Sequence, residues 1–469
     1  MSSPSTPKKL INLIRGWPSP SLLPTRLLQS ATTKLLSSSP QIFVPALQYG
    51  PDPGYQPLRE ALAVWLSAAY RTPTKPEQID ITGGASQSIA NLLSSYTDPA
   101  YTRAVWLVAP CYFLACPIFE DAGFGGRMRA IPEDEEGIDL HWLGRGLKEV
   151  DERRNGDEEP KYKPHLSNRK IYRHIIYAVP TCANPSGKSM SLRRRQGLVD
   201  LARHHDALII CDDVYDFLQW PIIDPSSTTT PPAPLPTPYP LLPRLSDIDI
   251  PLGPTKHDPP GKHFGHAVSN GSFSKLVAPG VRTGWVHGTA DFAHGVSATG
   301  ATRSGGAPSQ LCAAIICEML ASGELEDHLT RNVRPGLQAR HAAAMAAVKR
   351  VLGWVGVEVL GTSEAGKETF GGYFLWLTLP EGFDTKAVAE RAQREENLVV
   401  APGSNFEVAG DEEVLTFPRN LRLCYSWEEE ADIVQGIERL GAILRRMSAG
   451  EGEDVIGRGQ VEGVEEVFK

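Results

Sequence analysis

Short apolar segments separated by stretches of helical spacing constrain the fold of this chain more than any other feature. The apolar segments are residues 104–109 (AVWLVA), 175–179 (IIYAV), 207–211 (ALIIC) and 267–269, which lead into GSFSK. Between two of them, residues 191–205 place apolar side chains at helical spacing, with Arg193, Arg194 and Arg195 expected to point outward. This alternation predicts an α/β fold with a mostly parallel central sheet flanked by helices.

The order of these patterns along the 469 residues predicts two domains. We assign residues 51–335 to a large domain and residues 336–447 to a smaller α+β domain, to which residues 1–50 contribute. The small domain is expected to hold a helix at 338–351 and strands at 357–360, 373–379 and 420–425. Residues of about 144–170, dense in charge, and about 221–263, rich in proline, are expected to be exposed surface insertions. A ligand for a proline-binding partner is the alternative for the second, and residues 448–469 are expected to be disordered.

Charge and cysteine content narrow the classes of partner and the compartment. The chain has 47 basic and 55 acidic residues, a net charge of -8, and no strongly basic segment, which argues against nucleic acid. Its seven cysteines lack a paired metal-binding spacing and are expected to be reduced thiols, with no metal site. We find no signal peptide pattern and no run of about 18 apolar residues, so we expect a cytoplasmic protein without a membrane span.

The segment 271–285, GSFSKLVAPGVRTGW, carries the strongest chemical signal. Lys275 stands among small and apolar residues, and a primary amine is the group that captures an aldehyde cofactor. The segment resembles the cofactor-lysine motif of class I/II aminotransferases, the fold type I pyridoxal-phosphate enzymes, and the resemblance covers most of the chain. It implies that Lys275 binds pyridoxal 5'-phosphate as a Schiff base and that Arg282, Ser272 and Ser274 bind its phosphate. A surface ion pair is the alternative for Arg282 alone.

A second candidate phosphate contact is the segment 80–88, DITGGASQS, which predicts a strand turning through two glycines into a helix. Backbone amides at a helix start bind phosphate, and Gly84, Ala85 and Ser86 resemble the phosphate cup of the family. A glycine turn that caps an ordinary helix is the alternative. The family usually has a polar residue where Ala85 stands, so a contact there would come from the backbone.

Four further residues resemble the groups that hold the cofactor ring. Asp212, in CDDVYDFL, would keep the pyridine nitrogen protonated, and Tyr215 together with Asn184 would hydrogen-bond the phenolic oxygen. Tyr112, in VAPCYF, resembles the aromatic residue that stacks on the ring. Asp213 is an alternative partner for the nitrogen, and Asn184 in a turn or a tyrosine in the core are the structural alternatives.

The remaining resemblances concern substrate and subunit contacts. Arg422, in NLRLCYS, matches the late arginine of the family and would bind the α-carboxylate. Gly16 resembles the N-terminal glycine near that carboxylate, and Asn184 is a further candidate for a substrate contact. Trp17, beside Gly16, is bulkier than the usual residue and is expected to reshape the substrate pocket. Tyr49 resembles the tyrosine that reaches the cofactor of a neighbouring subunit, which implies a homodimer.

These residues together imply a transaminase that moves an amino group between an α-amino acid and a 2-oxo acid. The alternative is a pyridoxal-phosphate lyase or synthase that eliminates a β or γ group or closes a ring at the same site. A noncatalytic or regulatory protein with this fold is a weaker alternative. Hydrolase and dinucleotide-binding functions are disfavoured, because the sequence has no Gly-x-Ser-x-Gly, His-Glu-x-x-His or dinucleotide fingerprint.

Overall fold

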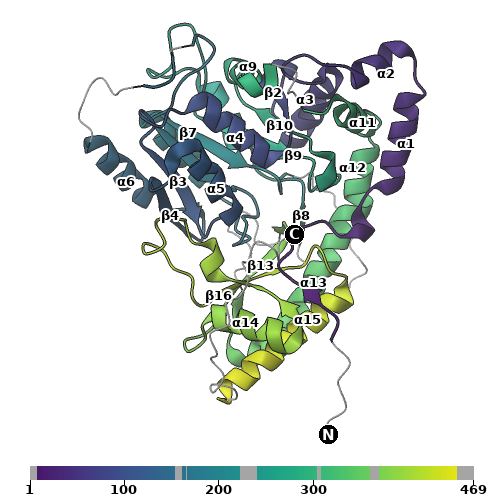
Figure 1. Ribbon diagram of the computed structural model, residues 1–469, viewed down its shortest axis with the longest axis vertical. Coiled ribbons are helices and arrows are strands. Elements are labelled where there is room, and N and C mark those ends of the chain that lie inside the picture. Colours follow the sequence, from purple (N-terminus) through teal and green to yellow (C-terminus); the bar gives the residue numbers. More distant parts are fainter. Residues whose placement is uncertain are drawn as a thin grey trace.

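An eight-stranded sheet forms the centre of the large domain in the computed structural model (Figure 1), which describes residues 8–153, 161–164, 166–221, 240–303, 308–359 and 369–450. The strand order is β2 (Ile79–Thr82), β10 (Gly284–His287), β9 (Ala267–Ser272), β7 (Ala207–Asp212), β6 (His174–Ala178), β3 (Ala104–Ala109), β4 (Met128–Asp134) and β5 (Gly137–Ile138). Strands β9, β7, β6, β3 and β4 run parallel, whereas β10 is antiparallel to both of its neighbours. The predicted α/β fold class is confirmed.

Helices cover both faces of this sheet, and alternate residues of each strand pack against opposite layers. Val105 and Leu107 of β3 pack with α4 (Ala85–Tyr96), α5 (Cys116–Phe119) and α9 (Ala290–Ser297). Ala104 and Trp106 pack on the other face with α6 (Leu140–Glu152), α7 (Leu192–His204) and α8 (Leu245–Asp249). A strand buried on both faces needs apolar side chains at every position, which explains the continuous apolar runs in the sequence.

Two expectations about surface residues are wrong. Residues 144–152 belong to helix α6 rather than to an exposed loop, because Asp139 caps its first turn and Leu143 and Leu147 bury one helical face. In the second segment, residues 245–249 form the buried helix α8. The central and proline-rich parts of these segments, 154–160 and 222–239, lie outside the described residues, as do 451–469 of the predicted tail.

Arg195 does not point outward either. Its guanidinium is buried and donates hydrogen bonds to the carbonyl oxygens of Met190, Pro180 and Pro243. Arg193, by contrast, is exposed and pairs with Glu136. Because three consecutive residues of a helix span most of a turn, Arg195 lies on a different face of α7 from Arg193, and that face is buried.

The small domain is built on a four-stranded sheet of order β11 (Glu358–Val359), β13 (Phe374–Thr378), β16 (Asn420–Cys424) and β15 (Ala401–Pro402). Helices α13 (Arg334–Leu352), α14 (Thr385–Glu396) and α15 (Glu430–Ser448) accompany it in the lower half of Figure 1. The N-terminal strand β1 (Ile11–Asn12) pairs in parallel with β14 (Leu398–Val399). None of the helices in the described ranges is long and apolar enough to cross a membrane.

The rest of the N-terminal segment crosses to the large domain. Helices α1 (Thr25–Leu36) and α2 (Pro40–Leu47) contact α11 (Gln310–Ala321), which also contacts α3 (Gln56–Tyr70), along the right edge of Figure 1. The short helices α10 (Gly300–Arg303) and α12 (Glu324–His328) flank α11. Residues 8–24 therefore lie with the small domain and α1 and α2 with the large one.

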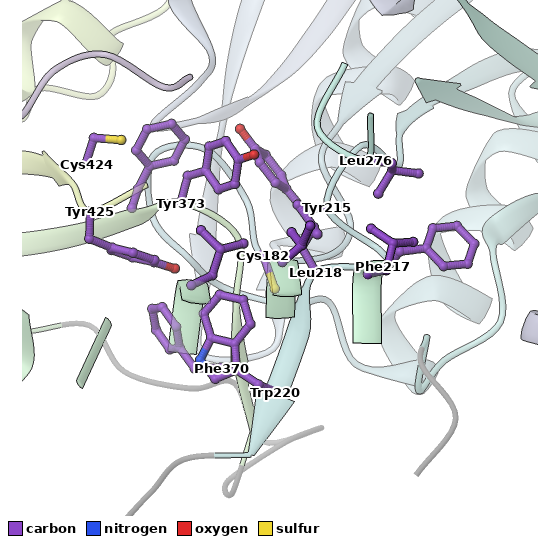
Figure 2. Packing of buried hydrophobic residues seen from close by; sticks show 14 of the residues in the cluster. Cys182, Tyr215, Phe217, Leu218, Trp220, Leu276, Phe370, Tyr373, Cys424 and Tyr425 are labelled. Atoms are coloured by element: carbon purple, nitrogen blue, oxygen red, sulfur yellow. The ribbon is translucent and has the colours of Figure 1, made fainter. Parts of the chain in front are cut away.

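A shared apolar cluster joins the two domains. Strand β8 (Gln219–Pro221), which follows β7, pairs with β12 (Thr369–Gly371), which precedes β13. Figure 2 shows the rings of Tyr215 and Tyr373 close together, and their centroids lie 5.5 Å apart. The hydroxyl of Tyr425 donates hydrogen bonds to the carbonyl oxygens of Gly371 and Gly372. This packing fixes the end of β7 relative to the sheet of the small domain.

Candidate active site

A cavity of about 260 Å³ lies where the carboxyl ends of the central strands meet the small domain and the N-terminal segment. Ligands of open α/β sheets bind at such strand ends. Most of the predicted site residues line it: Gly16, Ala85, Ser86, Tyr112, Asn184, Asp212, Tyr215, Ser272, Ser274, Lys275, Arg282 and Arg422. The structure thus brings together residues that are up to 406 positions apart in the sequence, from Gly16 to Arg422.

Asp212 presents an unpaired carboxylate oxygen at the cavity. Its Oδ2 accepts a hydrogen bond of 2.9 Å from the hydroxyl of Tyr177. Its Oδ1 is buried and has no hydrogen-bond partner within the described part of the chain. Burial raises the pKa of Asp212 to about 6, against the lowering effects of the Tyr177 hydrogen bond and the Lys275 charge. An orphaned acceptor of this kind fits a cationic ring N–H, such as that of a pyridinium.

Asp213, the alternative carboxylate, does not line the cavity. Burial raises its pKa well above the usual range, and the negative charge of Asp216 acts in the same direction. The positive charges of Arg195 and Arg244 act in the opposite direction. Asp213 therefore lies among buried charged residues outside the cavity lining, and Asp212 is the carboxylate that a cavity ligand meets.

Lys275 brings a primary amine with lowered basicity to the same cavity. Its Nζ donates a hydrogen bond to the carbonyl oxygen of Gly16. Burial lowers the pKa of Lys275 to about 8, and the positive charge of Arg422 acts in the same direction, whereas Asp212 opposes both. An amine with a pKa this close to neutrality has a substantial uncharged fraction, which is the form that attacks an aldehyde.

One corner of the cavity has the features of a phosphate site. Gly84 adopts a φ of 97° before α4, and a Cβ there would lie 2.6 Å from Nη2 of Arg282. Nη2 of Arg282 donates a hydrogen bond of 2.9 Å to the carbonyl of Gly83, and Nη1 donates one of 3.3 Å to Ser274 Oγ. The first amides of α4 have no intrahelical partners. Hydroxyls, helix-start amides and a guanidinium suit a phosphate dianion.

Arg422 is a buried cation that lines the same cavity. Its Nη1 donates to Asn184 Oδ1 at 2.8 Å and its Nη2 to the carbonyl of Ile14 at 2.7 Å. Burial lowers its pKa to about 10. Among the described residues it has no carboxylate within 4.0 Å, and its guanidinium lies 4.1 Å from the ring centroid of Phe374. A buried guanidinium without an anionic partner is suited to a carboxylate ligand.

The other predicted residues differ in their relation to the cavity. Tyr112 lines it, and burial together with the charge of Asp212 raises the Tyr112 pKa to about 12. A Cβ on Gly16 would lie 2.8 Å from Phe374 Cζ, so only glycine fits beside that ring. Tyr49 does not line the cavity of its own chain, and 87% of it is exposed.

Sequence reasoning missed three contributors. Tyr177 interrupts the apolar run of β6, and a hydroxyl inside a buried strand was the signal that it hydrogen-bonds a neighbour, here Asp212. Arg15 lines the cavity beside Gly16, and a cation next to that glycine was the signal in the sequence. Trp427 contacts Trp17 only through the tertiary fold, with ring centroids 5.5 Å apart, and no local pattern marks this contact.

Comparison with known proteins identifies the family that uses such a site. The family model for aminotransferase class I and II matches residues 25–440. The chain belongs to the class I and II aminotransferases. It is 36% identical to an uncharacterized protein of Saccharomyces cerevisiae, over 93% of this chain and 97% of the relative. It is 26% identical to aromatic-amino-acid aminotransferase 1 of Thermococcus litoralis, over 93% of this chain and 88% of the relative.

A solved relative has the same fold as this aminotransferase. The structure of Pyrococcus horikoshii kynurenine aminotransferase, in complex with PMP, is 25% identical, with a TM-score of 0.71 over 93% of this chain and 91% of that one. The predicted cofactor, pyridoxal 5'-phosphate, and the predicted transfer of an amino group between an amino acid and a 2-oxo acid are confirmed. The family assignment favours this reaction over the lyase alternative.

Proposed function

We propose that this aminotransferase holds pyridoxal 5'-phosphate covalently on Lys275 and binds the α-carboxylate of its substrates with Arg422. The observation that carries the proposal is the unpaired Oδ1 of Asp212, which lies in the same cavity as the Lys275 amine. When bound, the cofactor supplies an aldehyde that takes up the amino group and a ring that accepts electrons from the α carbon. The chain must supply the contacts and the proton transfers.

Lys275 is the proton carrier in this proposal. Its Nζ accepts the proton from the substrate α carbon and returns it to the carbon that receives the amino group, and a pKa of about 8 suits both transfers near neutral pH. Asp212 accepts a hydrogen bond from the pyridine nitrogen through Oδ1 and keeps that nitrogen protonated. Tyr215 and Asn184, which line the same cavity, would hydrogen-bond the phenolic oxygen, and Tyr112 would stack on the ring.

Binding of the phosphate and the α-carboxylate would orient the reacting atoms between two fixed cations. Arg282 binds the phosphate together with Ser272, Ser274 and the amides of Ala85 and Ser86, while Gly84 leaves room for the guanidinium. Arg422 forms a planar fork for the α-carboxylate, and its bonds to Asn184 and Ile14 hold that fork in place. Two anchors of this kind would orient the α carbon reproducibly relative to the bound cofactor.

A labelling experiment and a half-reaction test this proposal. Borohydride reduction of the purified holoenzyme should fix the cofactor on Lys275, as read by peptide mapping. Mixing the enzyme with an amino donor alone should convert the cofactor to pyridoxamine phosphate, and a 2-oxo acid should restore the original spectrum. A label on another lysine would contradict the assignment of Lys275. Release of ammonia or of a side-chain fragment would support the lyase alternative.

We also propose that the enzyme is a homodimer in which Tyr49 completes the neighbouring active site. The support is that Tyr49 is exposed together with Ile42, Val44 and Leu47 of the adjoining α2, an apolar set that a second copy would cover. Sedimentation should give the mass of a dimer, and Tyr49→Phe should weaken cofactor retention by removing a hydroxyl. A monomeric active enzyme, or unchanged cofactor retention, would contradict the proposal.

A cytoplasmic location is the last part of the proposal. It is supported by the seven cysteines, all of which have free thiols, as expected in a reducing compartment. Fractionation of cells that express the tagged protein tests the location, and recovery of the protein in an organelle fraction would contradict it.

A further inference from the structure

Besides those of Arg282 and Arg422, the active-site cavity contains a third guanidinium, that of Arg15, to which the reaction described above gives no role. Arg15 lies in the segment that follows β1 and lines the cavity together with Trp17. Its guanidinium carbon is 5.1 Å from the ring centroid of Trp17 and 5.7 Å from that of Trp427. The two indoles meet edge to face at 5.5 Å. Cation–π contacts with both rings therefore hold the Arg15 head in position at the cavity wall.

Arg15 also lacks the partners of a structural arginine. Its Nε is buried without a hydrogen-bond partner, and no carboxylate within the described ranges lies within 4.0 Å of the guanidinium. The positive charge of Arg15 acts on Glu428, whose Oε1 already accepts a hydrogen bond of 2.8 Å from the backbone amide of Asn12. The guanidinium thus keeps donors for a ligand that enters the cavity.

The backbone around Arg15 fixes its position relative to the reacting groups. The carbonyl of Ile14, the preceding residue, accepts a hydrogen bond from Arg422, and the carbonyl of Gly16, the following residue, accepts one from Lys275. One short segment therefore contacts the α-carboxylate anchor and the catalytic amine on either side of Arg15. A substrate held at Arg422 extends its side chain within a cavity whose wall also contains the Arg15 guanidinium.

We propose that Arg15 binds the side-chain carboxylate of a dicarboxylic substrate, so that one amino donor and acceptor pair is an acidic amino acid with its 2-oxo acid. This inference rests on the proposed function, because it takes Arg422 as the α-carboxylate anchor. A dicarboxylate would pair with both the Arg15 and the Arg422 guanidinium, neither of which has a carboxylate partner among the described residues. An aromatic side chain would instead have to compete for the indole faces that Arg15 already occupies, and it would leave the cation unpaired.

The first test compares substrates in half-reactions of the holoenzyme. For Arg15→Ala we expect kcat/KM to fall about 10- to 100-fold with glutamate and 2-oxoglutarate, the range for losing a hydrogen bond to a charged group. With alanine and pyruvate it should change less than about threefold. Arg15→Lys keeps the charge without the planar fork and should be intermediate. The matched control is Arg26→Ala on α1, an exposed arginine outside the cavity, which should leave both substrate pairs unchanged.

Equal losses for glutamate and alanine in Arg15→Ala, with cofactor content and circular dichroism unchanged, would overturn the role of Arg15 in side-chain recognition. Improved turnover of glutamate would overturn it as well. Turnover of aromatic amino acids that falls more than that of glutamate would assign Arg15 and the two indoles to an aromatic substrate instead.

The second test separates this inference from the proposed function. Glutarate, a dicarboxylate without an amino group, is titrated into the holoenzyme while the cofactor absorption and the tryptophan fluorescence are recorded, with butyrate as the monocarboxylate control. Glutarate should bind at least about tenfold more tightly than butyrate, and Arg15→Ala should remove the difference. If no amino acid is transaminated, the proposed function fails while glutarate binding still tests Arg15. Equal binding of glutarate to the wild type and to Arg15→Ala would overturn the inference and leave the proposed function standing.

Discussion

Replacing Asp212 with asparagine should stabilise the protein without its cofactor while it abolishes catalysis. Asp212 is buried, and its Oδ1 has no partner within the described residues. Burial raises its pKa from 3.8 to about 6, so at neutral pH the folded protein carries a carboxylate that is costly to bury. At about 1.4 kcal/mol for each pKa unit, the cost is about 3 kcal/mol. Asparagine removes this charge and keeps an oxygen that can accept the Tyr177 hydrogen bond.

The direction of the pKa shift of Asp212 determines how the stability difference between the two proteins depends on pH. The unfolded chain releases the Asp212 proton near pH 3.8 and the folded chain only near pH 6. The folded wild type is therefore favoured by protonation at low pH and loses that stabilisation as the pH rises from 3.8 to 6. Above pH 7 the advantage of Asp212→Asn should reach about 3 kcal/mol, and at pH 5 it should shrink to roughly half of that.

Urea unfolding of the cofactor-free wild type and of Asp212→Asn, at pH 7.5 and pH 5 and at matched protein concentration, measures this difference. Cofactor addition should then reverse the order, because the wild-type carboxylate gains a cationic partner that asparagine cannot pair with as strongly. The turnover of Asp212→Asn should fall by orders of magnitude. If the cofactor-free variant is no more stable than the wild type at pH 7.5, or if its advantage is the same at pH 5, the reasoning about the buried charge is refuted.

Two further substitutions probe the substrate side of the cavity. Arg422→Lys should lower kcat/KM for amino acids and 2-oxo acids by about 10- to 100-fold, because lysine lacks the planar fork of arginine. The cofactor content should not change. Unchanged kinetics with a lowered melting temperature would show that Arg422 has a structural role instead. Gly16→Ala should raise KM and destabilise the fold by about 1–3 kcal/mol, because the new Cβ would lie 2.8 Å from the Phe374 ring, which contacts the Arg422 guanidinium. An unchanged KM and melting temperature would show that the Phe374 side chain moves aside without cost.

Local patterns in the sequence were sufficient to predict the elements of the large domain. The run 104–109 coincides with β3, 207–211 falls within β7, and the helical stretch 191–205 contains α7. Each of these elements is specified by side chains within a few positions of one another, because apolar periodicity reflects burial directly. The motif around Lys275 likewise lies in one continuous segment, so its resemblance to the aminotransferases could be read without tertiary information.

The tertiary structure decided which side chains share a surface. The resemblance favoured Asp212, but apolar periodicity could not decide between Asp212, the last residue of β7, and Asp213, which follows it; the packing of the strand end decides which carboxylate meets the cavity. The position of Arg195 in the buried face of α7 depends on carbonyl groups of Pro180 and Pro243, which its own helix does not contain. The pair of indoles around Arg15 joins residues 17 and 427, which only the packing of the N-terminal segment on the small domain brings together. Contacts over such separations depend on the closure of the whole chain, and no local pattern encodes that closure.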